Sequence, residues 1–311
     1  MAVMTTGLVR HFRLKKTTVE AVRGVDLDIG DGELVALLGP NGAGKSTLFR
    51  MLTTLLPPTA GTATVAGRDI THDPDGVRAR IGYVGQKHSA GDNFRVRDEL
   101  VTQGRSHGMT RADATRRADE VLDLLDLTPL AKRTPNTLSG GQRRRVDIAM
   151  GLVHRPSLLF LDEPSTGLDP HSRADVWEQI LRLRDELAMT LVLSTHYLEE
   201  ADRMAERVVI IDHGRIIADG TADRLRGDLA GDRIVLTLDN PADAARIAGV
   251  VEVRGRTVHI SVPDAAAALP QQLRALDQSG VKVVAAQALQ PTLDDVFLAL
   301  TGRSIREQEA A

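Results

Sequence analysis

The stretch that decides the fold lies at residues 39–47 and reads Gly39-Pro40-Asn41-Gly42-Ala43-Gly44-Lys45-Ser46-Thr47. It fits the phosphate-loop pattern G-x-x-x-x-G-K-[ST], with the apolar run Leu34–Leu38 before it and a helical pattern after it. Glycines let backbone N–H groups curl around phosphate oxygens, and a helix that begins near Lys45 directs its positive dipole end at the same anion. Lys45 is expected to reach the β- and γ-phosphates and Ser46 to offer its hydroxyl to Mg²⁺. We therefore predict that all nine residues form a nucleotide-binding loop.

Composition bounds the rest of the chain. Its 311 residues suit one large domain plus a smaller one, and 42% hydrophobic with 26% charged residues is the balance of a globular protein. The net charge of −3 gives no electrostatic reason to expect nucleic acid as a partner. The chain has no cysteine, which excludes disulfides, zinc–thiolate sites and Cys nucleophiles. It has no apolar run of about 18 residues and no secretory signal pattern, so we expect a cytoplasmic protein.

From Gly7 to about Arg226, short apolar runs alternate with amphipathic helical patterns. This alternation predicts an α/β domain with a largely parallel central sheet. Residues 19–22 and 27–29 are predicted as antiparallel strands joined by a turn, and residues 96–127 as a helical insertion. The strands predicted for the central sheet include Leu34–Leu38, Leu158–Leu161, Thr190–Ser194 and Val208–Asp212.

The composition shifts near residues 228–232, where Gly, Asp and Ala replace the apolar runs. Beyond this point the pattern predicts the β-α-β-β-α-β order of a ferredoxin-like domain, followed by a last helix at 292–300. We therefore expect an ATP-binding domain at residues 1–227, with a helical subdomain at about 90–155, and an accessory or regulatory domain at 228–311. The six elements are predicted at 233–238, 242–247, 250–254, 257–262, 266–278 and 281–289.

Two acids end the apolar run Leu158–Leu161. A buried strand that ends in a carboxylate places it at the edge of the sheet where open α/β folds bind their ligands. Asp162 is expected to hold Mg²⁺, directly or through water, and Glu163 to polarise an attacking water as a general base. A pair of solvated acids is the simple alternative, and the phosphate loop in the same chain favours hydrolysis over it.

A second anion site is predicted at Leu138-Ser139-Gly140-Gly141-Gln142, where a serine and two glycines precede a basic helix. This segment resembles the signature motif of ABC ATPases. In that family it closes on the γ-phosphate of ATP held by the phosphate loop of the partner. The resemblance therefore implies a head-to-tail homodimer with ATP bound between Ser139–Gln142 of one copy and Gly39–Thr47 of the other.

Other positions match the ABC family in order. Gln86 is similar to the glutamine that contacts Mg²⁺ or water, residues 165–169 to the loop that crosses the dimer interface, and His196 to the histidine that bonds the γ-phosphate. Phe12 lies where the family has an aromatic residue that stacks on adenine, although a core role suits this position equally. The resemblance implies that Lys45, Gln86, Glu163 and His196 are the catalytic residues.

Longer stretches resemble the daunorubicin/doxorubicin-resistance type of ATP-binding subunit. They lie at 139–149, 167–173, 194–202, 211–216 and 291–302, and so cover most of the chain. This resemblance implies an ATPase subunit that drives efflux, of a drug or other hydrophobic compound, through a separately encoded membrane permease. It also implies a peripheral position on the cytoplasmic face of the membrane. The segment Asn93–Leu100 departs from the pattern of that group, which leaves the identity of the membrane partner open.

Two other interpretations stay open at this point. One is a soluble ABC ATPase that acts on the ribosome or on DNA, but such proteins carry two cassettes or long coiled coils, and this chain has one of each motif and no heptad run. The other is an inactive regulatory cassette, which the complete set of catalytic positions disfavours. Neither the cargo nor the direction of transport can be read from these residues.

Overall fold

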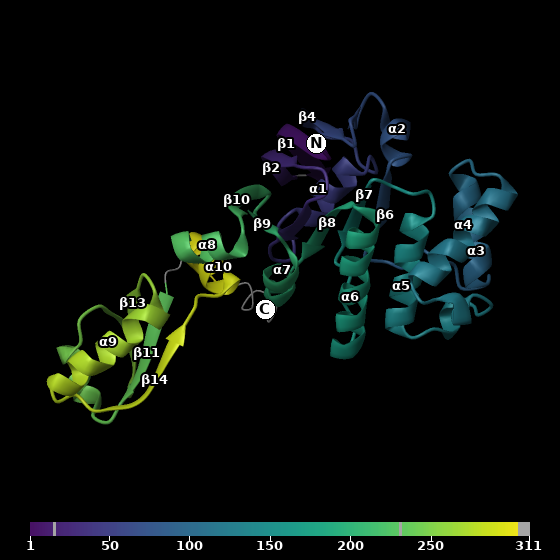
Figure 1. The fold of residues 1–311 in the computed structure, drawn as a ribbon. Helices are drawn as coiled ribbons and strands as arrows, with labels where there is room; N and C mark the ends of the chain where they lie inside the picture. Colours follow the sequence, from purple (N-terminus) through teal and green to yellow (C-terminus); the bar gives the residue numbers. More distant parts are fainter. Residues whose placement is uncertain (15–16, 230–231, 304–311) are drawn as a thin grey trace. The chain divides into compact units, whose positions relative to one another are not determined.

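A six-stranded sheet forms the centre of the first part of the chain, in a computed structural model that describes residues 1–14, 17–229 and 232–303 (Figure 1). Its strand order is β10-β9-β3-β8-β7-β6, and the neighbours from β9 to β6 pair in parallel. The prediction of a parallel α/β sheet is thus confirmed. The strands are β3 (Leu34–Leu38), β6 (Ile81–Val84), β7 (Leu158–Asp162), β8 (Thr190–Thr195), β9 (Arg207–Asp212) and β10 (Arg215–Gly220).

The parallel arrangement brings distant segments to one edge of this sheet. All residues of β3, β7 and β8 are buried, which explains why their apolar residues, at 34–38, 158–161 and 191–193, follow one another without alternation. The carboxyl ends of β3, β6, β7 and β8 point to the same edge because the strands are parallel. Residues 39–47, Gln86, Asp162 and His196 follow or end these four strands, so the topology gathers them.

The second sheet has the order β2-β1-β4-β5 and consists of β1 (Val3–Leu14), β2 (Thr17–Ile29), β4 (Ala60–Val65) and β5 (Arg68–Asp69). The prediction of two strands joined by a turn at residues 19–29 is wrong, since both belong to the single strand β2. The pairing with β1 jumps from Leu8↔Val25 to Val9↔Arg23, which leaves Gly24 as a bulge. A bulged glycine looks like a turn in the sequence, but the ladder continues on both sides of it.

Helices surround the central sheet. Residues 90–155 contain α3, α4 and α5 and two short 3₁₀ turns, and α3 packs on both α4 and α5 (Figure 1). In the part of the chain that the structure describes, every helix is too short or too polar to cross a membrane. The helices of this unit are α1 (Lys45–Leu52), α2 (Pro74–Arg78), α3 (Val96–Ser106), α4 (Arg111–Leu124), α5 (Gly140–Leu152), α6 (Pro170–Leu187) and α7 (Leu198–Met204), with 3₁₀ turns η1 (Thr128–Leu130) and η2 (Pro135–Thr137).

Aromatic packing fixes the first helix against the sheet. The rings of Phe49 in α1 and Phe160 in β7 meet edge to face with centroids 5.3 Å apart, and both side chains are fully buried. Such a pair contributes about 0.5–1.5 kcal/mol beyond its buried area. It also places the first turn of α1 beside the end of β7, where Asp162 lies.

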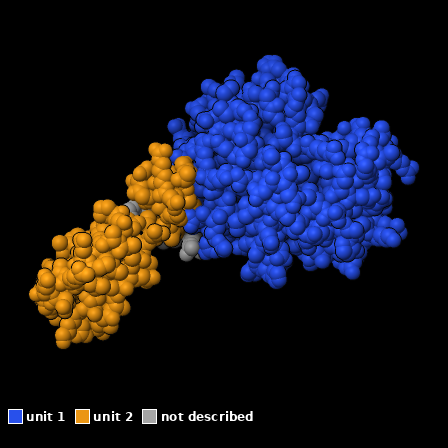
Figure 2. All heavy atoms as spheres, in the orientation of Figure 1, with its two compact units in different colours: residues 1–219 blue, residues 220–311 orange. Residues whose placement is uncertain are grey.

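The chain divides into two compact units, residues 1–219 and 220–311 (Figure 2). The division falls after Asp219, whereas the shift in sequence composition predicts a boundary after residue 227. The difference arises because helix α8 (Ala222–Leu229) packs on α10 (Leu293–Thr301), so residues 220–229 join the second unit.

The second unit contains an antiparallel sheet of order β12-β13-β11-β14. Numbered along the chain from β11, this is the order 4-1-3-2 of a ferredoxin-like sheet, as the sequence pattern predicts. The helix predicted at 242–247 is instead a 3₁₀ turn, because this helical segment is only six residues long. A separate apolar cluster that includes Ile234, Leu236, Val258 and Leu276 fills its core. Its elements are β11 (Asp232–Leu238), the 3₁₀ turn η3 (Pro241–Arg246), β12 (Val250–Arg254), β13 (Thr257–Val262), α9 (Ala265–Gln278) and β14 (Val283–Leu289).

Candidate active site

The loop between β3 and α1 depends on a glycine at its end. Gly44 has φ +107°, and a Cβ atom there would lie 2.4 Å from the backbone oxygen of Ala21. Any other residue would therefore be strained and would clash with β2. Gly44 is also the N-cap of α1 and has no side chain to cover the first turn, so the N–H groups of that turn remain accessible to an anion.

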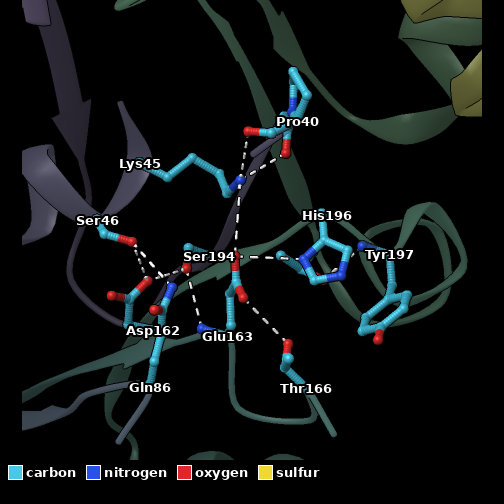
Figure 3. Close-up of polar contacts among 12 residues, drawn as sticks. Pro40, Lys45, Ser46, Gln86, Asp162, Glu163, Thr166, Ser194, His196 and Tyr197 are labelled. Carbon is cyan, nitrogen blue, oxygen red and sulfur yellow. Dashed lines mark hydrogen bonds and ion pairs between the residues drawn. The ribbon is translucent and has the colours of Figure 1, made fainter. Parts of the chain in front are cut away.

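The ammonium group of Lys45 lies against the backbone of this loop (Figure 3). Its ammonium group donates to the backbone oxygens of Gly39 at 2.6 Å and Pro40 at 3.0 Å, and it lies 4.0 Å from Oε1 of Glu163. The side chain is only 4% exposed, so its charge acts in a poorly solvated setting where electrostatic interactions are strong. A buried cation at the start of a helix suits the β- and γ-phosphates of a nucleotide.

Oxygen ligands gather around Asp162, which is itself buried. Its Oδ1 accepts hydrogen bonds from Ser46 Oγ at 3.1 Å and from Ser194 Oγ at 2.6 Å, and Nε2 of Gln86 donates to Ser46 Oγ at 3.3 Å. Among the described residues, no cluster of three or more His, Cys, Asp or Glu could hold a metal ion. One carboxylate, one hydroxyl and one amide are nevertheless a fitting set for Mg²⁺, which takes most of its other ligands from water and phosphate.

Tyr83 is a further neighbour of Asp162, and no sequence motif points to it. Its hydroxyl lies 3.5 Å from Oδ2 of Asp162. Burial, followed by the negative charge of Asp162, raises the pKa of Tyr83 to about 12. Tyr83 therefore stays protonated at neutral pH and can donate to the carboxylate.

Glu163 adopts a left-handed backbone conformation with φ +48°, which is uncommon for a residue with a side chain. Its N–H donates to the backbone oxygen and to Oγ of Ser194, both at 3.1 Å, and these bonds hold the turn. The turn aims the carboxylate of Glu163 away from Asp162 and toward Lys45 and His196 (Figure 3). The two adjacent acids therefore face different groups. Asp162 faces Ser46 and Ser194, whereas Glu163 faces Lys45 and His196.

The surroundings of Glu163 keep it ionised. Nδ1 of His196 lies 3.4 Å from Oε1, and Thr166 Oγ1 donates to Oε2 at 3.2 Å. The interaction with His196 is the largest cause of a lowered pKa of Glu163, with Lys45 and Thr166 acting in the same direction against the effect of burial. A carboxylate that is charged at neutral pH can accept a proton from water.

Two family models match parts of this chain. Residues 22–166 match the family model described as ABC transporter, and residues 220–301 match that of the DrrA1-3-like C-terminal domain of ATP-binding proteins. Over its whole length the chain is 41% identical to the daunorubicin resistance ATP-binding protein DrrA3 of Streptomyces coeruleorubidus, of which it covers 99%. The chain belongs to the ABC transporter family.

Within that family, the chain is of the daunorubicin/doxorubicin-resistance type, and it is an ATP-hydrolysing enzyme that binds ATP. It is 43% identical to the daunorubicin/doxorubicin resistance ATP-binding protein DrrA of Streptomyces peucetius, over 97% of this chain and 92% of that protein. Among solved structures, a dimeric ATP-binding cassette in a post-hydrolysis state with ADP and Pi superimposes with a TM-score of 0.64 at 26% identity, covering 70% of this chain and 98% of that one.

The ABC signature segment begins α5. Ser139 caps the helix by accepting from the N–H of Gln142 at 3.3 Å, while Oε1 of Gln142 accepts from the N–H of Ser139 at 3.1 Å. A Cβ atom on Gly141 would lie 2.9 Å from the Cβ of Ser172, so glycine permits α5 to approach α6 closely.

Arg144, two residues beyond that segment, holds the ends of two strands of the ABC cassette. Its buried guanidinium donates to the backbone oxygens of Gly85 at 2.7 Å, Pro164 at 2.7 Å and Asp162 at 3.1 Å. In the sequence alone, residues 143–145 indicate only a basic helix. One turn along α5, the buried carboxylate of Asp147 accepts from the N–H of Ser89 at 2.7 Å. Helix α5 is thus tied both to the loop after β6 and to the end of β7.

Phe12, in β1, lines a surface hollow. It is half-buried, and the guanidinium of Arg10 stands 4.8 Å from its ring centroid. A hollow of about 680 Å³ is lined by Phe12 and Thr18, and a second of about 510 Å³ is lined by Thr18 and Gly42. The aromatic ring and the phosphate loop therefore border neighbouring hollows that share Thr18.

Proposed function

We propose that two copies of this chain hydrolyse ATP in a head-to-tail dimer and thereby drive efflux through a separately encoded membrane subunit. The exported compound would be a drug or another hydrophobic molecule, and the chain would work at the cytoplasmic face of the cell membrane. The observation that carries the catalytic part is the contact of Glu163 with His196, beside Lys45. The names of the relatives, which refer to resistance against daunorubicin and doxorubicin, support the transport part.

The proposed chemistry assigns one task to each side chain. Lys45 and the N–H groups at the start of α1 hold the phosphates, and the carboxylate of Glu163 polarises the attacking water. His196, whose ring contacts Glu163, orients the γ-phosphate end of the site. Ser46, Asp162 and Gln86 would hold Mg²⁺, which neutralises phosphate charge when bound.

The dimer is proposed because the site has a phosphate loop but needs a second anion-binding element. Ser139–Gln142 is such an element, at the N-terminus of a helix of 13 residues. Its capping bonds join Ser139 and Gln142 to each other. The related cassette was solved as a dimer. ATP bound between Gly39–Thr47 of one copy and Ser139–Gln142 of the other would make association depend on the nucleotide.

The site for the membrane subunit is proposed at a hollow of about 230 Å³ between the central sheet and the helical subdomain. Its lining includes Leu55, Tyr83, Ser89 and Met150, so it adjoins both the Asp162 cluster and the loop after Gln86. Leu55 is 58% exposed, which gives the rim an apolar side chain for a partner to cover. Movement of this loop would couple the nucleotide site to the membrane subunit.

The decisive experiment uses Glu163→Gln, with Glu199→Gln as the control because Glu199 is exposed. Glu163→Gln should reduce ATP turnover at least about 100-fold, the lower range for loss of a general base, while ATP still binds. On size-exclusion chromatography with ATP, this variant should elute as a dimer. Normal turnover would refute the role of Glu163, and a monomer at saturating ATP would refute the dimer.

The transport part needs a separate test. When the chain is co-expressed with the multi-span membrane protein encoded beside its gene, the two should co-purify. Leu55→Glu should weaken this association while leaving the ATPase activity of the isolated chain unchanged. Co-purification with ribosomes or DNA instead would refute the transporter assignment.

A further inference from the structure

Glu200 is a buried carboxylate outside the residues assigned so far. It lies in the first turn of α7 and is 5% exposed. Oε1 accepts a hydrogen bond from Ser165 Oγ, and Oε2 accepts one from Thr195 Oγ1 at 2.8 Å. A buried carboxylate contributes little net stability even when it is paired, because its desolvation is costly. Its role is better understood from the two segments that it joins.

The first segment carries His196. Thr195, which precedes the histidine, donates through Oγ1 to Glu200 and accepts through the same atom from the N–H of Tyr197 at 3.0 Å. The hydroxyl of Thr195, which is bonded to Glu200, therefore fixes both neighbours of His196, Thr195 itself and Tyr197. Because a hydroxyl has a single proton, the carboxylate leaves the oxygen of Thr195 free to accept from Tyr197.

The second segment carries Glu163. Ser165 is only two residues beyond it, and the next residue, Thr166, donates to Oε2 of Glu163 at 3.2 Å. Both Ser165 and Thr195 are 1% exposed, so their bonds to Glu200 are shielded from water. One carboxylate thus ties the backbone next to Glu163 to the backbone next to His196.

Arg173 completes the arrangement from α6. Its Nε lies 3.8 Å from Oε1 of Glu200, which partly compensates the buried negative charge. Its guanidinium also stands 4.3 Å from the ring centroid of Tyr197, and that ring lies 4.2 Å from the ring of His196. The imidazole is therefore braced on the side of Tyr197, while its Nδ1 faces Glu163 (Figure 3).

We propose that Glu200 is a positioning residue for ATP hydrolysis, which locks the turn at Ser165 to the end of β8 and so sets the separation of Glu163 and His196. This inference rests on the roles proposed above for Glu163 and His196. The hydrogen bonds of Glu200 go to Ser165 and Thr195, and so it acts on Glu163 and His196 through these two residues.

The test compares Glu200→Ala with Glu199→Ala in the full-length chain. Glu199 is the exposed neighbour in the same helical turn, so it controls for any general effect on α7. Glu200→Ala should lower kcat at least about tenfold, since a displacement of about 1 Å can cost about 100-fold, while the Kd for ATP changes less than about threefold. Glu200→Gln, which keeps one acceptor oxygen, should recover part of the lost kcat. Glu199→Ala should match the parent.

The split between kcat and the Kd for ATP separates positioning from simple loss of structure. Loss of structure lowers ATP affinity and kcat together, whereas a displaced Glu163 or His196 lowers kcat and leaves ATP binding in place. Should Glu200→Ala fail to fold, Ser165→Ala and Thr195→Val each remove one of the two bonds with little change in volume. The same fall in kcat with little change in Kd is then expected.

The outcomes distinguish this inference from the function on which it rests. Glu163→Gln and His196→Ala serve as benchmarks, and normal turnover in both would refute the proposed function itself. If both lose turnover while Glu200→Ala keeps the kcat of the parent, the positioning role is wrong. An equal loss of ATP affinity and kcat would also overturn it.

Discussion

Nδ1 of His196 lies 3.4 Å from Oε1 of Glu163, and this contact is the main reason that the pKa of Glu163 is lowered. Glu163 directly follows β7 and His196 directly follows β8, and these two strands are parallel neighbours. Their side chains meet because Glu163 turns out of β7 with a left-handed backbone conformation. The contact links the backbone geometry of one strand end to the charge of the proposed base.

His196→Ala should therefore change both the rate and the pH dependence of hydrolysis. Loss of the imidazole raises the pKa of Glu163, so the carboxylate becomes protonated, and inactive as a base, at a higher pH than in the parent. The acid limb of kcat should move to higher pH, and kcat at its optimum should fall at least about 100-fold. His72→Ala, at an exposed position, is the matched control. An unmoved acid limb would separate His196 from Glu163.

Asp162→Asn should weaken Mg²⁺ binding more than ATP binding. The substitution keeps the hydrogen bonds with Ser46 and Ser194 possible but removes the negative charge. The Mg²⁺ concentration for half-maximal ATPase activity should rise about 10–100-fold. Asp185→Asn, at an exposed position in α6, should leave it unchanged. An unchanged Mg²⁺ requirement in Asp162→Asn would show that the metal is held elsewhere.

Arg144→Leu should destabilise the first unit. The change leaves the backbone oxygens of Gly85, Asp162 and Pro164 buried without their donor, and loss of such bonds lowers the free energy of unfolding by about 2–4 kcal/mol. Arg143→Leu breaks the exposed ion pair with Asp92 and should cost less than about 1 kcal/mol. Urea denaturation measures both. Similar values for the two variants would contradict the account of Arg144.

His154 should make the stability of the protein depend on pH. Its Nε2 lies 2.8 Å from the backbone oxygen of Ile81, its ring stacks on that of His107 at 3.8 Å, and burial followed by the charge of His107 lowers its pKa to about 4. In the unfolded chain it would bind a proton near its ordinary value of 6.5. The free energy of unfolding should therefore fall as the pH drops from about 6.5 to about 4. His154→Phe should show a shallower fall than the parent, whereas His72→Phe should not.

A chain that ends after Asp219 should fold and bind ATP. The first unit has its own core, and Arg207 keeps its two hydrogen bonds to Asp219, at 2.7 and 2.8 Å, in the shortened chain. We expect weaker ATP-dependent dimerisation or weaker association with the membrane subunit, measured by chromatography and co-purification. A shortened chain that folds but does not bind ATP would contradict the separation of the two units.

The sequence by itself determined the elements whose signals are local. The phosphate loop follows from the order of glycines, Lys45 and Ser46 between a strand and a helix. The strands Val250–Arg254 and Thr257–Val262 have the same bounds in the structure as in the prediction, since the turn at Gly255 separates two short apolar runs. The acids at the end of β7 were identifiable for the same reason, because a buried strand has to end where polar residues begin.

The tertiary structure alone decided which polar side chains meet inside the fold. Glu200 and Ser165 are 35 residues apart, and Arg144 lies 59 residues from Gly85, so no local pattern relates them. Periodicity tells which face of an element is buried but not which partner it finds there. Strand β2 likewise continues through Gly24 because it pairs with β1 on both sides of that residue, and this pairing cannot be read from the sequence of β2. Buried hydrogen bonds are satisfied only once the chain has closed these long loops, so only the folded chain reveals them.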